Sequence, residues 1–154
     1  MLSLIHGLKT FAELDTYVLY ELGSLRQAVF VLEQNCPYQD LDGKDLHSHH
    51  LMAYTSSERK EIVAYCRIVP PGLSYENEVS IGRVLTPLHL RKMGYGKILV
   101  QEAIKSCQKL YPNTSIRISA QTYLLKFYQD LGFIATDIAY LEDNIPHTEM
   151  YYPI

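Results

Sequence analysis

A strand-like run that leads through a glycine turn into an amphipathic helix constrains the fold of this chain more than any other feature. The run EVSIGRVLT spans residues 78–86 and is ended by Pro87, and the stretch LRKMGYGKIL follows at residues 90–99. The apolar spacing beyond the turn predicts a helix from Gly96 to about Leu110. Its inward-facing positions are Leu99, Ala103, Cys107 and Leu110. A strand, a turn and a covering helix in this order are typical of an α/β domain.

The rest of the chain continues this alternation. A first helix, capped by Asp15 or Thr16 and running to about Glu33, carries one buried face. The positions on that face are Val18, Leu22, Leu25, Val29 and Leu32. The further elements are a hairpin over 49–56 and 60–69 joined by the turn SERK, a strand over 114–121, a short helix over 122–133 with Gly132 as its C-terminal glycine, and two strands around a turn at Asp143 and Asn144. We expect one α/β domain over residues 1–154, with a central mixed sheet flanked by helices.

Composition narrows the classes of partner. The formal net charge is -3 and the pI is near 6.0, whereas nucleic-acid-binding domains usually carry a basic surplus. No window reaches the roughly 20 apolar residues that cross a bilayer, and the N-terminus lacks the pattern of a signal peptide. The 3 cysteines lack paired metal spacing. We expect a soluble cytoplasmic protein with reduced thiols, and neither nucleic acid nor membrane as a partner.

The glycine turn itself is typical of an anion site. The first N–H groups of a helix have no intrahelical partners, and they point outward with the positive end of the helix dipole. Gly94 and Gly96 would leave these amides open to a phosphate, and Arg91, Lys92 and Lys97 would add positive charge. The pattern matches neither the nucleotide-hydrolase loop nor the dinucleotide fingerprint. A tight turn with solvated lysines is the alternative interpretation.

Two motifs in the correct order resemble the GCN5-related N-acetyltransferases. Arg91-x-x-Gly94-x-Gly96 is similar to the loop that binds the acyl-CoA pyrophosphate in that family, and FYQDLGF at 127–133 is similar to its second signature. The resemblance extends from about Gln27 to the end of the chain. VFVLEQNCPYQDLDG at 29–43 and IPHTEM at 145–150 resemble the ElaA branch of the family.

This resemblance implies an acetyl-CoA site between two parallel strands that splay apart. The residues implied in cofactor binding are the strand edge Val84, Leu85 and Thr86, the turn residues Arg91, Lys92, Met93, Gly94, Tyr95, Gly96 and Lys97, and Tyr128. Tyr128 is also the implied catalytic acid, which would protonate the departing thiolate. Because Tyr128 follows the helix spacing of its neighbours, a core tyrosine is the alternative. Lys126 is a candidate for the cofactor's third phosphate, or an ordinary exposed lysine.

Arg83 is the most informative anomaly in the strand-like run. Strict alternation puts Val79, Ile81, Arg83 and Leu85 on one face. A guanidinium among aliphatic side chains must be paired if it is buried. Arg83 either reaches the acceptor cleft and binds a substrate carboxylate there, or forms an internal ion pair with Asp42, Asp45 or Glu33.

The aspartates and histidines of the loop DLDGKDLHSHH at 40–50 raise the possibility of a metal site. The aspartate spacing does not match the calcium-loop pattern, and the histidines do not follow helix spacing, so we expect no metal site. In the ElaA branch this segment resembles a wall of the acceptor pocket. The substrate-binding candidates are Arg26, Glu33, Gln34, Asp42, Asp45, His50, Arg83 and Gln121. A helix end and a solvated acidic loop form the alternative interpretation.

The group that deprotonates the acceptor amine is the least defined part of the site. His147, within IPHTEM, titrates in the right range and is the candidate base, with Glu142 as a neighbour. The alternatives are that His147 has only a structural role, or that water removes the proton from the amine. Glu78 lies on the opposite strand face from Arg83 and is not an obvious choice.

The expected function is an N-acetyltransferase that moves acetyl from acetyl-CoA to a primary amine of a small molecule or peptide. Two alternatives remain. Arg26-x-x-Val29-Phe30 and Asp42-x-x-Asp45 also resemble the acyl-homoserine-lactone synthases, although the chain is short for that group. A non-catalytic acyl-CoA-binding sensor is the other. Edge strands near the C-terminus make a homodimer a further expectation.

Overall fold

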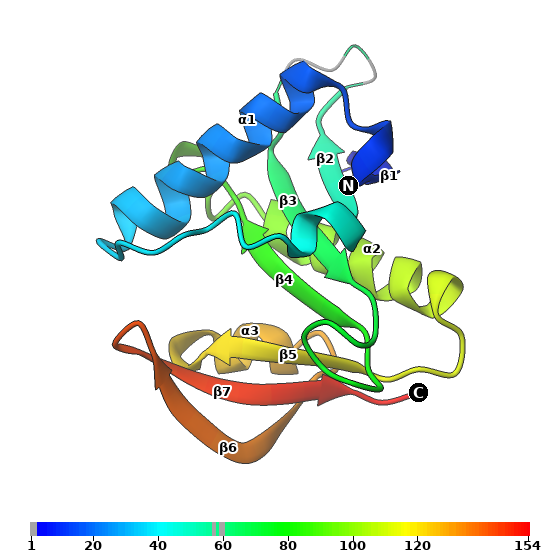
Figure 1. Cartoon of the computed structure of the whole chain (residues 1–154), viewed down its shortest axis with the longest axis vertical. Coiled ribbons are helices and arrows are strands. Elements are labelled where there is room, and N and C mark those ends of the chain that lie inside the picture. The colour runs from blue at the N-terminus through cyan, green and yellow to red at the C-terminus, as the bar shows by residue number, and fades with distance from the viewer. Residues whose placement is uncertain (1–2, 57, 59–60) are drawn as a thin grey trace.

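The computed structural model describes residues 3–56, 58 and 61–154 and builds them around two antiparallel sheets (Figure 1). The first sheet has the order β1-β2-β3-β4, with bounds Ile5–Thr10, His49–Tyr54, Ala64–Val69 and Ser80–Leu85. The second has the order β5-β7-β6, with bounds Ile116–Gln121, Ile145–Tyr152 and Ile134–Glu142. The helices are α1 (Thr16–Arg26), α2 (Tyr95–Leu110) and α3 (Leu125–Gln129).

The two sheets meet at a single parallel bridge and then separate. Val79, just before β4, bridges Ile116 of β5, and the Arg117 N–H donates to the Val79 carbonyl at 2.9 Å. Beyond this point β4 and β5 diverge (Figure 1). This is the mixed α/β arrangement with splayed strands that the sequence predicted.

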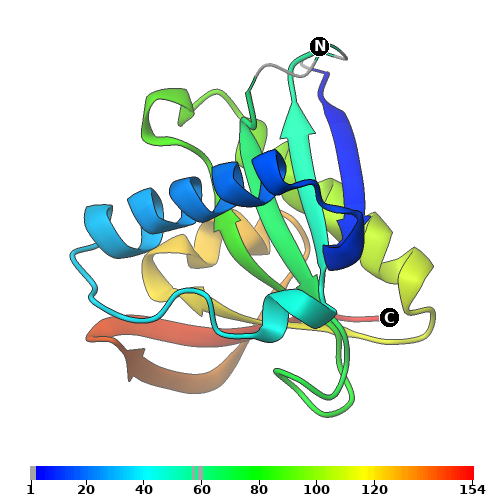
Figure 2. The ribbon, with the colours of Figure 1, turned by 45° about the horizontal axis from the view of Figure 1, so that its top comes forward.

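Two apolar clusters hold helices against opposite faces of the first sheet (Figure 2). Leu99, Val100 and Ala103 of α2 are fully buried with Leu51 and Cys66 of the sheet. On the other face, the buried side chains are Val18 and Leu22 of α1 with Met52, Tyr65 and Leu85. Because both faces are covered, every residue of β3 is buried, which gives the site a rigid support.

The first helix begins as predicted but changes its winding. The Asp15 side chain accepts from the Val18 N–H at 2.8 Å, which confirms the cap. After Arg26 the chain continues as a π-helical segment over Gln27–Glu33. A π turn holds more residues than an α turn, so the predicted face drifts. Leu32 is consequently 70% exposed, and its predicted burial is wrong.

A bulge in β4 overturns the predicted alternation of that strand. Tyr65 pairs with Leu85 and Arg67 with Gly82, so β4 carries extra residues opposite Cys66, and Arg83 has a φ of 50°. Ile81 therefore packs on the α2 side and Leu85 on the α1 side. The prediction that both share a face with Arg83 is wrong, because alternation holds only for an unbroken ladder.

The turns near the C-terminus follow the sequence closely. Gly132 has a φ of 102°, and Asp143 and Asn144 have φ values of 49° and 63°, which suit a tight hairpin between β6 and β7. Strand β1 was not predicted, and residues 57, 59 and 60 of the SERK turn lie outside the described residues. Among the described residues, no helix combines the length and apolar character needed to cross a membrane.

Candidate active site

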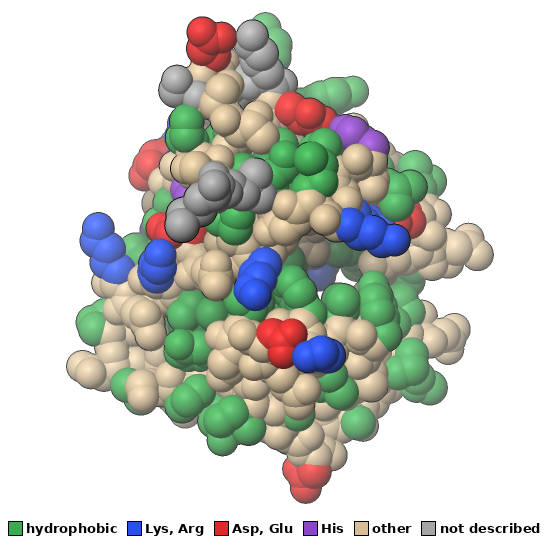
Figure 3. Space-filling view, turned by 180° about the vertical axis from the view of Figure 1, so that it is seen from behind, with side chains coloured by type: hydrophobic (Ala, Val, Ile, Leu, Met, Phe, Trp, Pro, Cys, Tyr) green, Lys and Arg blue, Asp and Glu red, His purple; other side chains and the backbone are tan. Residues whose placement is uncertain are grey.

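A large cavity of about 910 Å³ lies where β4 and β5 diverge. Viewed from behind, the surface is hollowed between the part that holds β1–β4 and the part that holds β5–β7 (Figure 3). The predicted cofactor residues that line the cavity are Val84, Leu85, Thr86, Arg91, Lys92, Gly94, Tyr95, Gly96, Lys97 and Tyr128. Met93 does not line it and is 52% exposed. The structure thus brings together all but one of that set.

The glycine turn leaves the first amides of α2 without partners. Gly94 is the N-cap with a φ of 84°, and no side chain caps the helix. The first bond of the helix runs from the Ile98 N–H to the Gly94 carbonyl at 3.3 Å. In the described part of the chain, no backbone acceptor meets the N–H groups of Tyr95, Gly96 or Lys97. An anion at this end of the cavity would find open donors and the positive end of the dipole.

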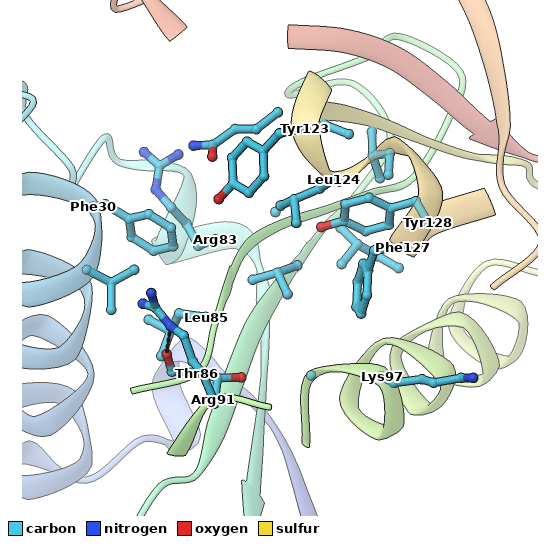
Figure 4. Close-up of a pocket in the computed structure, with 18 of the residues that line it drawn as sticks. Phe30, Arg83, Leu85, Thr86, Arg91, Lys97, Tyr123, Leu124, Phe127 and Tyr128 are labelled. Carbon is cyan, nitrogen blue, oxygen red and sulfur yellow. Dashed lines mark hydrogen bonds between the residues drawn. The ribbon is translucent and has the colours of Figure 1, made fainter. Parts of the chain in front are cut away.

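The cations around this turn differ in what they reach. Arg91 donates from Nε to the Thr86 carbonyl at 3.1 Å and from Nη2 to Glu33 at 2.6 Å. It therefore ties the turn to the end of β4 and to the π-helical segment. Lys92 has a φ of 66°. The Lys97 side chain runs along α2, away from the other residues drawn in Figure 4.

Tyr128 projects from α3 into the cavity (Figure 4). Its ring packs edge-on against Phe127 at 5.0 Å and Phe133 at 5.6 Å between centroids. Burial raises the pKa of its hydroxyl well above the usual value of 10. No hydrogen bond from the described residues contributes to this shift. Tyr128 thus presents a neutral hydroxyl to the cavity.

A small cavity of about 130 Å³ adjoins the large one and shares Phe30, Gln34, Arg83, Gln121 and Ile145 with it. Its remaining lining residues are Cys36, Tyr38, Glu142, Asp143 and His147. The Gln121 amide donates to the Gln34 amide oxygen at 3.3 Å. Figure 4 shows Arg83 beside Phe30, and both residues line both cavities.

His147 enters the small cavity from β7. Its Nδ1 lies 2.7 Å from the Ile145 carbonyl oxygen, and a carbonyl can only accept. Nδ1 therefore carries the proton, which leaves a lone pair on Nε2 of the neutral ring. Nε2 lies 3.6 Å from Glu142, too far for a hydrogen bond. The imidazole stacks on the Tyr140 ring, with 6.0 Å between centroids.

Arg83 does belong to the cavity wall, but its charge is already paired. Its Nε lies 2.7 Å from an Asp40 carboxylate oxygen, and its Nη2 lies 3.5 Å from Asp42. The Phe30 and Tyr38 rings flank the guanidinium at 5.9 and 5.5 Å. The internal ion pair that the sequence offered as one alternative is present with Asp42, and Asp40 is a partner that was missed.

The acceptor-wall prediction needs correction for Arg26, Asp42, Asp45 and His50, none of which lines either cavity. Arg26 is 3% exposed and holds Asp40 at 2.7 Å and Asp45 at 2.6 Å. Asp42 receives two hydrogen bonds from Arg67, at 2.7 and 2.6 Å. These groups lie in an ion-pair cluster because buried charges must find partners.

His50 is part of the same buried region. Its Nε2 lies 3.0 Å from the Asp45 carbonyl and its Nδ1 2.8 Å from the Tyr65 hydroxyl. Burial lowers its pKa below the usual 6.5. Glu33, Gln34 and Gln121, in contrast, line the large cavity as predicted.

Sequence reasoning missed several residues of the wall. Phe30, Tyr123, Leu124 and Phe127 line the large cavity, and Asp143 lines the small one. Leu124 and Phe127 fall at the helix spacing already used for Tyr128, so that spacing was the available signal. Asp143 had been assigned only to a turn.

Comparison with known proteins agrees with this geometry. Residues 24–153 match the family described as acetyltransferase (GNAT) domain. Protein ElaA of Escherichia coli (strain K12) is 41% identical over 141 residues, which cover 90% of this chain and 90% of that protein. The crystal structure of Escherichia coli ElaA shares the fold with a TM-score of 0.87 at 37% identity, over 97% of this chain and 99% of that chain.

Two further solved structures are similar. An acyl-CoA N-acyltransferase from Pseudomonas aeruginosa has a TM-score of 0.87 at 40% identity, covering 97% of this chain and 99% of that chain. A Bacillus subtilis acetyltransferase in complex with CoA has a TM-score of 0.69 at 20% identity, covering 99% of each chain. The second likeness shows a shared fold alone.

Proposed function

Because the chain belongs to the acetyltransferase (GNAT) family, in its ElaA-like branch, and is an acyltransferase, we propose that it transfers acetyl from acetyl-CoA to a primary amine of a small molecule or peptide. One observation carries the proposal. The unpartnered amides at the start of α2 and the Tyr128 hydroxyl line the same cavity. An acyl-CoA presents a diphosphate to the first and a thioester to the second.

The turn residues fit a diphosphate. Gly94, in the left-handed region, opens the amides of Tyr95, Gly96 and Lys97, and Arg91 and Lys92 stand beside them. A Cβ at Gly96 would meet Thr86 Oγ1 at 3.5 Å, so the turn lies close against the end of β4. The CoA complex of the Bacillus subtilis protein, which has the same fold, supports this assignment.

Acetyl-CoA supplies an activated acetyl thioester, and the chain supplies proton transfers around it. The raised pKa of Tyr128 keeps its hydroxyl protonated at neutral pH. It can therefore donate to a sulfur that gains negative charge as the C–S bond breaks. Transfer from a phenol to a thiolate is uphill, so close placement must help it.

His147 is the base in this proposal. Its free Nε2 can take the proton that the amine loses as the C–N bond forms. The amine would enter through the small cavity, past His147, and reach the thioester where the two cavities meet. Gln34 and Gln121 would line that path.

Ligand-induced thermal stabilisation tests the cofactor site. At a hundredfold excess over Kd, binding stabilises by about 2.7 kcal/mol, which corresponds to a rise in Tm of about 5–10 °C for a chain of this size. Gly94→Trp should abolish the rise. Gly72→Trp is the matched control, since Gly72 also has a positive φ, 96°, and an added Cβ there meets open space. No rise with millimolar acetyl-CoA in the wild type would refute the proposal.

Two substitutions test the chemistry. Tyr128→Phe should lower kcat about a hundredfold or more, because it removes the proton donor, while the acetyl-CoA shift in Tm stays. His147→Gln should lower kcat/KM, because the glutamine amide cannot take up the proton that the amine loses. A Tyr128→Phe enzyme with unchanged kcat would assign the acid role elsewhere, and absence of thiol release from the wild type with a broad amine panel would favour a sensor.

A further inference from the structure

We propose that the acceptor is an amine that carries a second positive charge, a linear diamine or polyamine, and that Glu142 and Asp143 bind this second charge in the small cavity. The inference rests on the proposed function, because it names the substrate class of the same site. It is argued from which charges around the two cavities are already paired and which are open.

The positive charge of Arg83 is not available to an acceptor. Three guanidinium groups and three carboxylates form one ion-pair cluster, buried except at Asp42 and Arg83, with contacts of 2.6 to 3.5 Å. Its members are Arg26, Arg67, Arg83, Asp40, Asp42 and Asp45. Equal numbers of opposite charges leave no net charge. A substrate carboxylate would have to displace Asp40 or Asp42 from Arg83, so the cluster disfavours an amino-acid-like acceptor.

The acidic side chains of the small cavity, unlike those of the ion-pair cluster, have no lysine or arginine partner among the described residues. Glu142 lies 3.6 Å from Nε2 of His147, beyond hydrogen-bond distance, and no lysine or arginine of the described residues forms an ion pair with it. No lysine or arginine of the described chain forms an ion pair with Asp143. The two residues sit at the tight turn between β6 and β7, where φ values of 49° and 63° at Asp143 and Asn144 hold the backbone.

The remaining wall fits an alkylammonium group. Ile145 and the Cys36 thiol are apolar, and Gln34 and Gln121 are neutral. Burial, and then the charge of Asp143 and a hydrogen bond to it, raise the pKa of the Cys36 thiol, so this group stays neutral as well. The small cavity has a volume of about 130 Å³. A short amine arm occupies such a space.

The two ends of the site therefore differ in sign. Unpartnered amides and Lys92 line the large cavity at the α2 end, which suits the diphosphate. Glu142 and Asp143 line the small one, which suits a cation. This separation of charge would also keep the anionic acetyl-CoA out of the small cavity, where the acceptor amine binds.

A matched set of acceptors tests the inference. The probes are 1,4-diaminobutane, n-butylamine and 4-aminobutanoate, which share a four-carbon chain and differ in the terminal charge. We expect kcat/KM in acetyl-CoA thiol release to be at least about tenfold higher for the diamine than for butylamine, and lowest for 4-aminobutanoate. Added salt should reduce the preference for the diamine.

Two variants test whether Glu142 and Asp143 cause the preference for the diamine. Glu142→Gln and Asp143→Asn should each lower the ratio of kcat/KM for the diamine to kcat/KM for butylamine about three- to tenfold, and keep the acetyl-CoA shift in Tm. Asp137→Asn removes a carboxylate from β6 outside both cavities. It should change neither the preference for the diamine nor the acetyl-CoA shift in Tm.

The possible failures are distinguishable. Equal or faster turnover of 4-aminobutanoate, or an unchanged diamine preference in both variants, overturns the charge assignment and leaves the transferase proposal standing. Absence of thiol release with all three amines, with the acetyl-CoA shift intact, overturns this inference, and absence with the broad amine panel as well overturns the proposed function.

Discussion

Asp45→Asn should destabilise the protein strongly, because it removes a shared partner from the buried ion-pair cluster. The Asp45 Oδ1 atom accepts from Arg26 Nη1 at 2.6 Å and from Arg67 Nη1 at 3.1 Å. The side chains of Arg26 and Arg67 are 3% and 5% exposed. Breaking a buried pair on one side costs about 3–5 kcal/mol, since the remaining charge is left without compensation.

Urea denaturation followed by circular dichroism measures this loss. We expect the free energy of unfolding to fall by about 3 kcal/mol, at the low end of that range because asparagine keeps one acceptor oxygen. The change corresponds to about 6–12 °C in Tm for a chain of this length. Asp130→Asn is the control, because it removes the exposed pair with Lys126 and should change stability by less than about 0.5 kcal/mol.

Acid titration of stability supplies an independent check. Burial alone would raise the pKa of Asp45, but the hydrogen bonds and charges of Arg26 and Arg67 outweigh it and hold the pKa below its usual 3.8. The group therefore contributes stability that is fully present above that value and is lost as the pH falls below it. The variant should lose less stability over the same range. A loss below 1 kcal/mol at pH 7, with acid curves parallel to wild type, would refute the reasoning.

Further outcomes are expected for substitutions at four single positions. Gly94→Ala should lower the free energy of unfolding by about 1–2 kcal/mol, because φ is 84° at this residue. Gly23→Ala within α1 should instead raise it by about 0.5–1 kcal/mol, because an added Cβ there meets nothing within 4 Å. Burial holds the pKa of His50 below 6.5, so its contribution to stability is complete above pH 6.5 and is lost as the pH falls; His50→Gln should flatten the urea-midpoint curve in that range. Gly132→Ala, with φ at 102° and an added Cβ 2.9 Å from Tyr152, should lower Tm by more than Gly94→Ala, and an equal change would show that the ring moves aside freely.

What the sequence by itself determined is local in origin. The glycine turn before α2, the capping of α1 by Asp15, the C-terminal glycine at Gly132 and the turn at Asp143 each depend on residues within one helical turn or one hairpin. Such features follow from φ preferences and short-range hydrogen bonds, which the chain carries wherever it packs. The glycine turn that lines one end of the large cavity was readable for this reason.

Only the tertiary structure decided which faces are buried and how the charged residues beside the two cavities pair. The bulge at Arg83 and the π-helical winding that exposes Leu32 override regular periodicity, because packing against a second element determines which face is buried. The partners of Arg26 and Arg83 lie 14 and 43 residues away along the chain, as the bonds to Asp40 show. Which charges pair, and which stay open to a substrate, depends on desolvation between distant segments, and no local pattern encodes that.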